Sequence, residues 1–323
     1  MIVRDNSTDE HKRSLLPQFA RDNCTIILAE PCDMRTNILE ILWKAKGKFI
    51  FIMADDDFCF DHAIPVISRM LDEHGNDPSL AGLTGAYAVE TSQRSAVLEY
   101  KNVDSADVTQ RVAGFINYSG PNILLYAPIR RELVQKMYGF LGEQPYLFSF
   151  HDQIVCLLYV MNGKFLPINR LLYLYDVGPW EKPHTAQQRD VDFYKAAGFD
   201  PAINKLHWFL CGFEGAVLAL NSDLFPDIPR GQRQAIADRW FASMFQRFVG
   251  QQRLTFDSPL TGEADAVCAK LRASTGQLSF QGMLVEVCSF IALSSPEVAE
   301  RYFKFWDGMI NRPKPAVQQP ASA

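Results

Sequence analysis

The sequence predicts an α/β protein in which helices flank a mixed sheet, followed by an all-helical C-terminal module. Over residues 1–100, short apolar strands alternate with amphipathic helices, as in parallel β-α units whose sheet is covered on both faces. After Trp180, apolar residues recur at helical spacing instead. The chain has 323 residues, enough for one large domain or two ordinary ones.

Turn residues bound each apolar run of the first part, and the period within each run assigns its element. Strands are expected from Ile2 and at 25–28, 49–54, 80–89, 96–100, 122–127, 164–168 and 171–175. Helices are expected at 35–46, 61–73, 130–138 and 152–161. The order of these elements predicts Rossmann-like layering that continues into a mixed sheet.

The second part reads as helices only. They are expected at 206–220, 233–248, 264–271, 281–293 and 296–309. Pro, Gln, Ser and Ala dominate the last residues, which have little to bury and are expected to be disordered. The predicted organisation is a sheet domain at 1–180, a helical module at 181–311 and a tail at 312–323.

Composition excludes several function classes. The net charge is -5 and the basic residues are scattered, which argues against nucleic-acid binding. No apolar run approaches the roughly 20 residues that span a bilayer, so a cytoplasmic protein with at most peripheral membrane contact is expected. The seven cysteines include no C-x-x-C pair, and reduced core thiols are expected.

The most informative motif is an apolar run that ends in three carboxylates, Phe49 to Asp57. In an extended chain, Asp55 and Asp57 point the same way, roughly 7 Å apart, while Asp56 points oppositely. Two such oxygen donors suit Mg²⁺ or Mn²⁺, which take further ligands from substrate phosphates. Alternatively, the cluster caps the helix that begins near Asp61 or forms a solvated turn.

The motifs around the triplet occur in an informative order: Asp5-Asn6-Ser7-Thr8-Asp9 after a strand, then Arg35-Thr36-Asn37, then Gly47-Lys48 before the acidic run. Over residues 1–180 this order resembles the family 2 (GT-A fold) nucleotide-sugar glycosyltransferases. The resemblance implies a GT-A sheet domain and transfer of a sugar from a nucleoside diphosphate, with a UDP-sugar favoured. A glycan or a lipid-linked molecule would be the acceptor, in polysaccharide or glycoconjugate synthesis.

By resemblance, Asp57 binds the metal, Mn²⁺ or Mg²⁺, and Asp55 shares the metal or meets the donor ribose. Asp56 would join the nucleotide-sugar site if a turn rotates it inward. Asp5 would contact the base or ribose, and Asn37 is a weaker match because Thr36 replaces the family's arginine. Turn and helix-start roles explain Asp5 and Asn37 equally simply.

Asp152 follows His151 at the position where the family carries an acidic pair whose second member is the general base. The resemblance implies that Asp152 deprotonates the acceptor hydroxyl and that transfer inverts the anomeric centre. Without it, a first-turn carboxylate favoured by the helix dipole is the simpler interpretation. Three roles stay open for His151: it assists the general base, it binds the acceptor, or it has no part in the reaction. Ser119 to Asn122 could shape the acceptor side or form a plain turn.

A loop at 178–184 contains Trp180 and His184. Related folds often have a lid here, sometimes with a metal-contacting histidine, so His184 is a candidate metal ligand. A lone loop histidine is more often simply exposed.

The sequence departs from the family in one large respect, since Met1 stands directly before the family's second strand and the first β-α unit is missing. The exposed strand edge predicts a homodimer or higher oligomer. The missing β-α unit also supports a second hypothesis, in which the protein is a non-catalytic relative that acts as a binding or assembly component. A nucleotidyltransferase would show a Gly-rich basic loop after its first strand, and a dehydrogenase would show G-x-G-x-x-G; neither is present.

Overall fold

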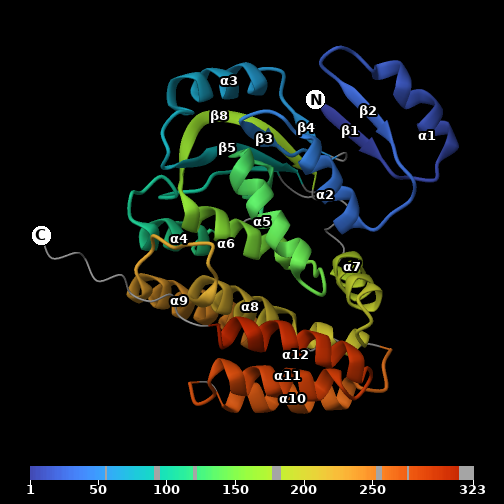
Figure 1. Ribbon diagram of the computed structural model, residues 1–323, viewed down its shortest axis with the longest axis vertical. Coiled ribbons are helices and arrows are strands. Elements are labelled where there is room, and N and C mark those ends of the chain that lie inside the picture. The colour runs from blue at the N-terminus through green and yellow to red at the C-terminus, as the bar shows by residue number, and fades with distance from the viewer. Residues whose placement is uncertain are drawn as a thin grey trace, which may run out of the picture.

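The computed structural model describes residues 1–54, 57–90, 95–118, 122–176, 183–251, 257–274 and 276–312; for Met34 and residues 183–186 it describes the backbone only. The protein is α/β, with a mixed sheet flanked by helices and a helical C-terminal region, as the sequence predicts (Figure 1). No helix in these ranges is long and apolar enough to cross a membrane. All seven cysteines are free thiols, and five of them are buried.

The strands are short except for two. They are β1 (Ile2–Asp5), β2 (Thr25–Leu28), β3 (Phe49–Phe51), β4 (Phe58–Cys59), β5 (Leu80–Glu90), β6 (Ser95–Leu98), β7 (Pro128–Arg130) and β8 (Lys164–Asp176). The helices of the first part are α1 (Glu10–Leu15), α2 (Met34–Lys44), α3 (Ala63–His74), α4 (Val108–Ile116), α5 (Arg131–Glu143) and α6 (His151–Asn162), with 3₁₀ turns η1 (Leu16–Phe19) and η2 (Ile123–Tyr126).

Within the described residues of the second part, the regular elements are all helices. It consists of α7 (Pro183–Ala196), the 3₁₀ helix η4 (Pro201–Leu206), α8 (His207–Asn221), α9 (Arg230–Gly250), α10 (Thr261–Ala273), α11 (Phe280–Ile291) and α12 (Pro296–Ile310). The five helices expected after residue 206 are therefore confirmed, with ends that differ by a few residues.

The main sheet has the strand order β3-β7-β5-β8-β4, with β6 paired to the end of β5. Strands β5 and β8 run parallel, and the other pairs are antiparallel. The strands within residues 1–100 were expected to form parallel β-α units of one sheet, and this expectation needs correction. Within the described residues, β1 and β2 pair only with each other, in a separate parallel two-stranded sheet. Strand β3 pairs with β7, which comes much later in the chain.

Helices cover both faces of the main sheet, α3 on one side and α4, α5 and α6 on the other (Figure 1). Beneath these lie α8 and α9, and then α12, α11 and α10 form the far end of the molecule. The core explains why two helices are apolar on all sides. Helix α6 is buried from Ile154 to Met161, and α8 from Phe209 to Leu220. One hydrophobic cluster includes both helices and continues from the sheet into the C-terminal helices.

Some expectations for individual elements were wrong, and three helices were missed. The segment 122–127 is not a strand, because Ile123 and Leu124 both turn into the core as part of η2. The strands expected at 164–168 and 171–175 are one strand, β8, whose register on β5 shifts near Gly85. Helices α1, α4 and α7 were not predicted; α1 and α7 bury little or carry many polar residues, so their apolar period is weak.

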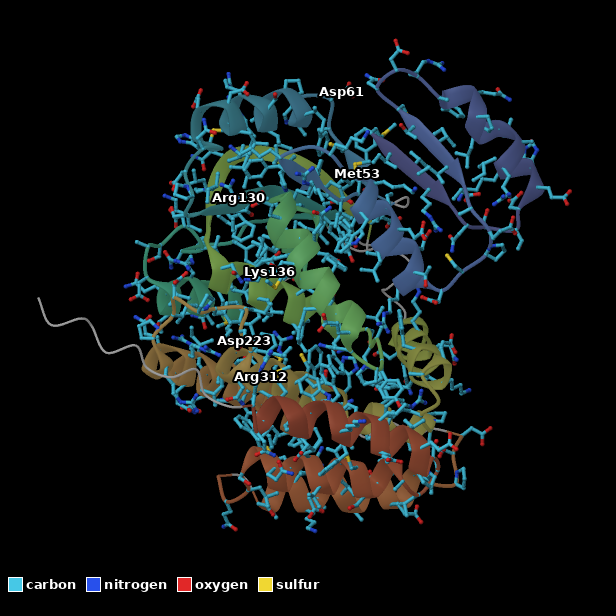
Figure 2. All side chains as sticks on the ribbon, in the orientation of Figure 1. Met53, Asp61, Arg130, Lys136, Asp223 and Arg312 are labelled. Atoms are coloured by element: carbon cyan, nitrogen blue, oxygen red, sulfur yellow. The ribbon has the colours of Figure 1, made fainter. Side chains whose placement is uncertain are left out.

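One polar contact joins the second part of the chain to the first, and another lies within the second part. Lys136 of α5 donates to the carbonyl of Leu224, 2.9 Å away, and Arg312 pairs with Asp223 at 2.5 Å. Figure 2 labels Lys136, Asp223 and Arg312, the last two in the part of the molecule where α8, α9 and α12 lie. Arg312, the first residue of the predicted disordered tail, is therefore anchored, and residues 313–323 lie outside the described part.

Arg111 of α4 holds the C-terminal end of α6. Its guanidinium donates to the carbonyls of Val160 (2.9 Å) and Met161 (3.4 Å), and also to those of Ser105 (2.9 Å) and Ala106 (3.0 Å). The last carbonyls of a helix have no partner within the helix. Arg111 supplies those partners and places a positive charge at the negative end of the helix dipole.

We expect Arg111→Ala to lower the free energy of unfolding by about 2–4 kcal/mol, because it leaves several buried carbonyls unpaired. Urea denaturation measures the change. The control is Arg239→Ala, at an exposed position of α9, which should stay within about 0.5 kcal/mol of the wild type. Equal effects of the two substitutions would contradict this role of Arg111.

Candidate active site

The acidic motif lies between the edge strands of the main sheet. Strand β3 ends at Phe51, and β4 begins directly after Asp57 and pairs with β8. The strand expected to continue to residue 54 is therefore shorter, because pairing with β7 stops where β7 begins at Pro128. Asp57 itself lies in a bend directly before β4 and not in a strand. Asp55 and Asp56 lie outside the described residues.

Asp57 is held firmly by β8. Its Oδ2 accepts a hydrogen bond from the Tyr173 hydroxyl at 2.6 Å, and its Oδ1 accepts one from the backbone N–H of Asp176 at 3.0 Å. Burial, and then the adjacent Asp57 carboxylate, raise the pKa of Tyr173 well above its ordinary value. The hydroxyl therefore remains a donor.

Aromatic rings fix Tyr173 in place. Its ring lies 5.7 Å from those of Tyr87 and Tyr126 and 6.3 Å from that of Phe51, measured between centroids. Tyr173 is not among the site residues predicted from the sequence. One feature of the sequence could have indicated it. Tyr173 and Tyr175 are two residues apart in the last strand, so their rings lie on the same face of the sheet.

Asp152 lies in the first turn of α6, as predicted, and is partly buried. Burial raises its pKa to about 6, although the Asn122 amide, the Gln153 backbone N–H and His151 act in the opposite direction. Its Oδ1 accepts from that N–H at 2.6 Å. A carboxylate with a pKa near the working pH is suited to general base catalysis.

His151 is not free to bind an acceptor. It is buried, its Nδ1 accepts from the backbone N–H of Phe148 at 3.0 Å, and its Nε2 lies 2.9 Å from the Glu214 carboxylate. Because Nδ1 accepts, Nε2 carries the proton and donates to Glu214. The hydroxyl of Tyr302 donates to the other oxygen of Glu214 at 2.7 Å. This network ties α8 and α12 to the helix end that carries Asp152.

The turn η2 links the two acidic positions. Tyr126, at its end, stacks on Tyr173, whose hydroxyl holds Asp57. Asn122, directly before η2, lies beside Asp152 and lowers its pKa, but neither of its amide atoms completes a well-formed hydrogen bond. The two ends of η2 therefore connect to the two carboxylates, Tyr126 to Asp57 through Tyr173 and Asn122 to Asp152.

The other predicted residues lie elsewhere. Asp5 is buried at the end of β1, where its carboxylate contacts Lys12 Nζ at 2.9 Å and accepts from the Ser7 hydroxyl at 3.0 Å. Burial alone would raise the pKa of Asp5, but hydrogen bonds from Lys12 and Ser7 outweigh it and the pKa is lowered. Asn37, in α2, accepts from Arg4. Both belong to the N-terminal unit, which shares no ladder with the sheet beside Asp57 in the described residues.

Two further predictions fall at the limit of the described chain. Helix α7 begins at Pro183, so His184 lies in its first turn and not in a loop; its side chain is outside the described part. Among the described residues, no group of three or more His, Cys, Asp or Glu side chains is placed to hold a metal ion. The proposed metal set therefore depends on Asp55 and His184, whose side chains the structure does not describe.

No family model matches the chain, and no curated protein matches it. Among solved structures, the chain is similar to three crystal structures of S. aureus TarS. TarS 1-349 is 12% identical, with 95% of this chain and 80% of that chain covered and a TM-score of 0.47. Its complex with UDP-GlcNAc is 12% identical over 96% and 80%, with a TM-score of 0.48. A longer TarS structure is 11% identical, with 95% of this chain and 49% of that chain covered and a TM-score of 0.47. These scores are too low for the likeness to establish a shared fold or activity.

Proposed function

We propose that this protein is an inverting glycosyltransferase that moves a sugar from a nucleoside diphosphate, with UDP favoured, to an acceptor hydroxyl. The observation that carries the proposal is Asp152, a carboxylate whose pKa burial raises to about 6 and which connects through η2 and Tyr173 to the anchored carboxylate of Asp57. In the proposal the Asp152 carboxylate accepts a proton, and the Asp57 carboxylate is a ligand of a divalent cation.

In this proposal the residues have separate tasks. Asp57, with Asp55 and His184, would hold Mg²⁺ or Mn²⁺, which when bound neutralises charge on the departing diphosphate. Asp5, Asn37, Asp55 and Asp56 would contact the nucleotide sugar. Asp152 removes the acceptor hydroxyl's proton as that oxygen attacks the anomeric carbon from the face opposite the leaving group, and inversion follows.

The test is isothermal titration of UDP and of GDP into the protein, with Mn²⁺ or with EDTA, repeated on Asp57→Ala. We expect one nucleotide to bind only with the metal and binding to weaken at least tenfold in the variant, since a metal ligand is lost. Asp61→Ala is the matched control, because Asp61 is exposed and lies beyond β4, and it should bind as the wild type does. Binding that ignores both metal and Asp57 would contradict the assignment.

A second candidate is a non-catalytic relative that acts as a binding or assembly component. The occupied side chains of Asp5 and Asn37 favour it, since Lys12 and Arg4 already use the oxygens that a nucleotide would need. The same titration separates the two: no binding of either nucleotide under any condition would favour the non-catalytic protein.

A further inference from the structure

Glu214 is a carboxylate inside the apolar core. It lies on α8, whose residues from Phe209 to Leu220 are all buried, and only 1% of its side chain is exposed. Two donors reach it, Nε2 of His151 at 2.9 Å and the hydroxyl of Tyr302 at 2.7 Å. Each carboxylate oxygen therefore accepts one hydrogen bond. Burying a carboxylate costs stability even when it is paired, so packing alone gives no reason for one at this position.

The start of α6 depends on the side chain of His151. Phe150, the residue that caps this helix, makes no side-chain hydrogen bond to it. Instead, Nδ1 of His151 accepts from the backbone N–H of Phe148 at 3.0 Å, while the backbone N–H of His151 donates to the carbonyl of Phe148 at 3.0 Å. This reciprocal pair of hydrogen bonds closes the turn directly before Asp152, much as a capping box does. The turn therefore needs an imidazole whose Nδ1 carries no proton.

Glu214 fixes that tautomer. In a neutral imidazole, the hydrogen bond made by one ring nitrogen decides which nitrogen holds the proton. The carboxylate of Glu214 accepts from Nε2 of His151, so the proton stays there and Nδ1 can accept. The rings of Phe148 and Phe150 pack around the imidazole, with centroids 5.5 and 5.0 Å from its own. Among these apolar rings, the hydrogen bond to Glu214 is stronger than it would be in water.

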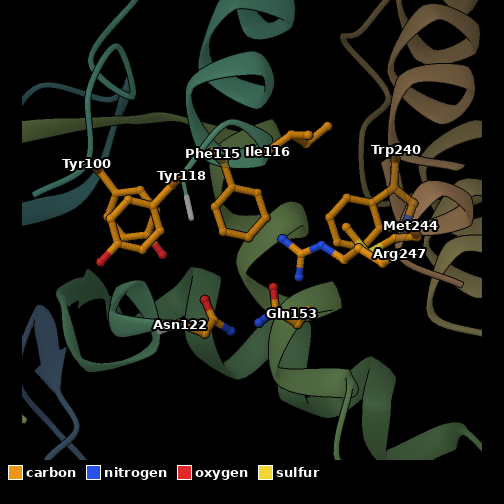
Figure 3. Close-up of a pocket in the computed structure, with 9 residues that line it drawn as sticks. All are labelled: Tyr100, Phe115, Ile116, Tyr118, Asn122, Gln153, Trp240, Met244 and Arg247. Atoms are coloured by element: carbon orange, nitrogen blue, oxygen red, sulfur yellow. The ribbon is translucent and has the colours of Figure 1, made fainter. Parts of the chain in front are cut away.

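Other elements of the second part also lie at this turn. The hydroxyl of Ser149 donates to Asp190 of α7 at 2.5 Å. Gln153, the residue after Asp152, lines a small pocket between α4, α6 and α9, beside Asn122 (Figure 3). Helices α7, α8 and α9 therefore all approach the turn that carries Asp152, and α8 does so through a buried histidine.

We propose that Glu214 is a positioning residue of the transfer site: by holding His151 in the form protonated on Nε2, it fixes the turn that orients the Asp152 carboxylate. This role rests on the proposed function, in which Asp152 is the base. A base must lie within hydrogen-bond distance of the hydroxyl that it deprotonates, and a displacement of about 1 Å can cost a factor of about 100 in rate. The second part of the chain then contributes to the reaction through α8.

The first experiment identifies the tautomer of His151 by nitrogen NMR of protein labelled in its histidine rings, with His151→Leu to assign the signal. We expect the wild type to carry the proton on Nε2. Glu214→Leu removes the acceptor, so the other tautomer or an exchanging mixture should appear. Glu214→Gln is the matched control, because its amide oxygen can still accept from Nε2, and it should keep the wild-type tautomer. A wild type protonated on Nδ1, or a tautomer that Glu214→Leu leaves unchanged, would overturn the proposal.

The second experiment measures release of UDP from UDP-glucose and from UDP-N-acetylglucosamine, with Mn²⁺ present and water as the acceptor. We expect Glu214→Leu to lower kcat about 10- to 100-fold and to bind UDP as the wild type does, because the proposed donor site uses other residues. Glu214→Gln should keep most of the activity. His151→Leu breaks the same link from the other end and should lose as much activity as Glu214→Leu, so it carries the test if Glu214→Leu does not fold.

Tyr302→Phe separates positioning from stability. It removes the other hydrogen bond to the same carboxylate and leaves the one from His151 in place. We expect the melting temperature to fall by about 2–4 °C, while kcat stays near the wild-type value. If Tyr302→Phe lowers kcat as much as Glu214→Leu does, or if Glu214→Leu keeps its kcat, the network serves only the fold and the proposal is wrong.

The outcomes also separate this proposal from the proposed function. If the wild type releases UDP and Glu214→Leu does so equally well, only the role of Glu214 fails. If the wild type releases no UDP, the role of Glu214 in catalysis fails whatever the tautomer of His151, and the nucleotide titration then decides whether the donor site stands.

Discussion

Replacing Asp152 by Asn is expected to reduce sugar transfer by a factor of about 10²–10⁴, the usual contribution of a general base. The amide has nearly the same shape but cannot take the proton of the acceptor hydroxyl. Binding of UDP with Mn²⁺ should not change, because the proposed donor site uses other residues. The measurement is transfer from a UDP-sugar, with Asp72→Asn, an exposed carboxylate of α3, as the control.

The pH dependence of the wild type gives an independent check. The base must be deprotonated to act, and burial raises the pKa of Asp152 to about 6. Transfer should therefore increase as the pH rises through about 6 and level off above it. A rate that is already constant well below this pH would contradict Asp152 as the base, even if Asp152→Asn is inactive.

The same shift predicts that Asp152→Asn remains folded. The folded pKa of about 6 lies above the ordinary value of 3.8, so the folded state binds more protons between these values. The unfolding free energy of the wild type should fall as the pH rises through this window, by at most about 3 kcal/mol. Asn lacks this titration, so the variant should be as stable as the wild type or more stable at neutral pH. Urea denaturation at both ends of the window measures it, and an unstable variant would contradict the explanation.

Gly215→Ala should produce the largest loss of stability, about 2–5 kcal/mol, from overpacking and a broken buried hydrogen bond. A Cβ at this position of α8 would lie 2.2 Å from Nε1 of Trp240 and 2.8 Å from its Cε2. The indole is buried, and its N–H donates to the carbonyl of Cys211 at 3.0 Å. The methyl group must displace the indole or separate α8 from α9.

Gly308→Ala is the matched control. Gly308 lies within α12, and a Cβ there would meet nothing within 4 Å. Alanine favours a helix more than glycine does, so this variant should gain about 0.5–1 kcal/mol. Urea denaturation of both variants measures the difference. If Gly215→Ala also gains stability, α8 and α9 cannot be in such close contact in solution.

Much of the fold could be predicted because its signals are local. Helix α6 and the five helices from α8 onward follow the apolar period, and β5 follows a continuous apolar run. The segment 122–127 was misassigned for the opposite reason. Its apolar residues suit a strand or a buried turn equally, and only the packing of Ile123 and Leu124 into the core decides between them.

By itself, the sequence determined the class of the fold, the helical second part and the placement of Asp152 at the start of a buried helix. Only the tertiary structure decided that the Tyr173 hydroxyl donates to Asp57 and that His151 donates to Glu214. It also decided that residues of α9 line the pocket beside Asn122. Secondary structure follows from the spacing of residues near one another in the chain. The partners of a side chain depend on which distant elements pack together, and spacing along the chain carries little information about that choice.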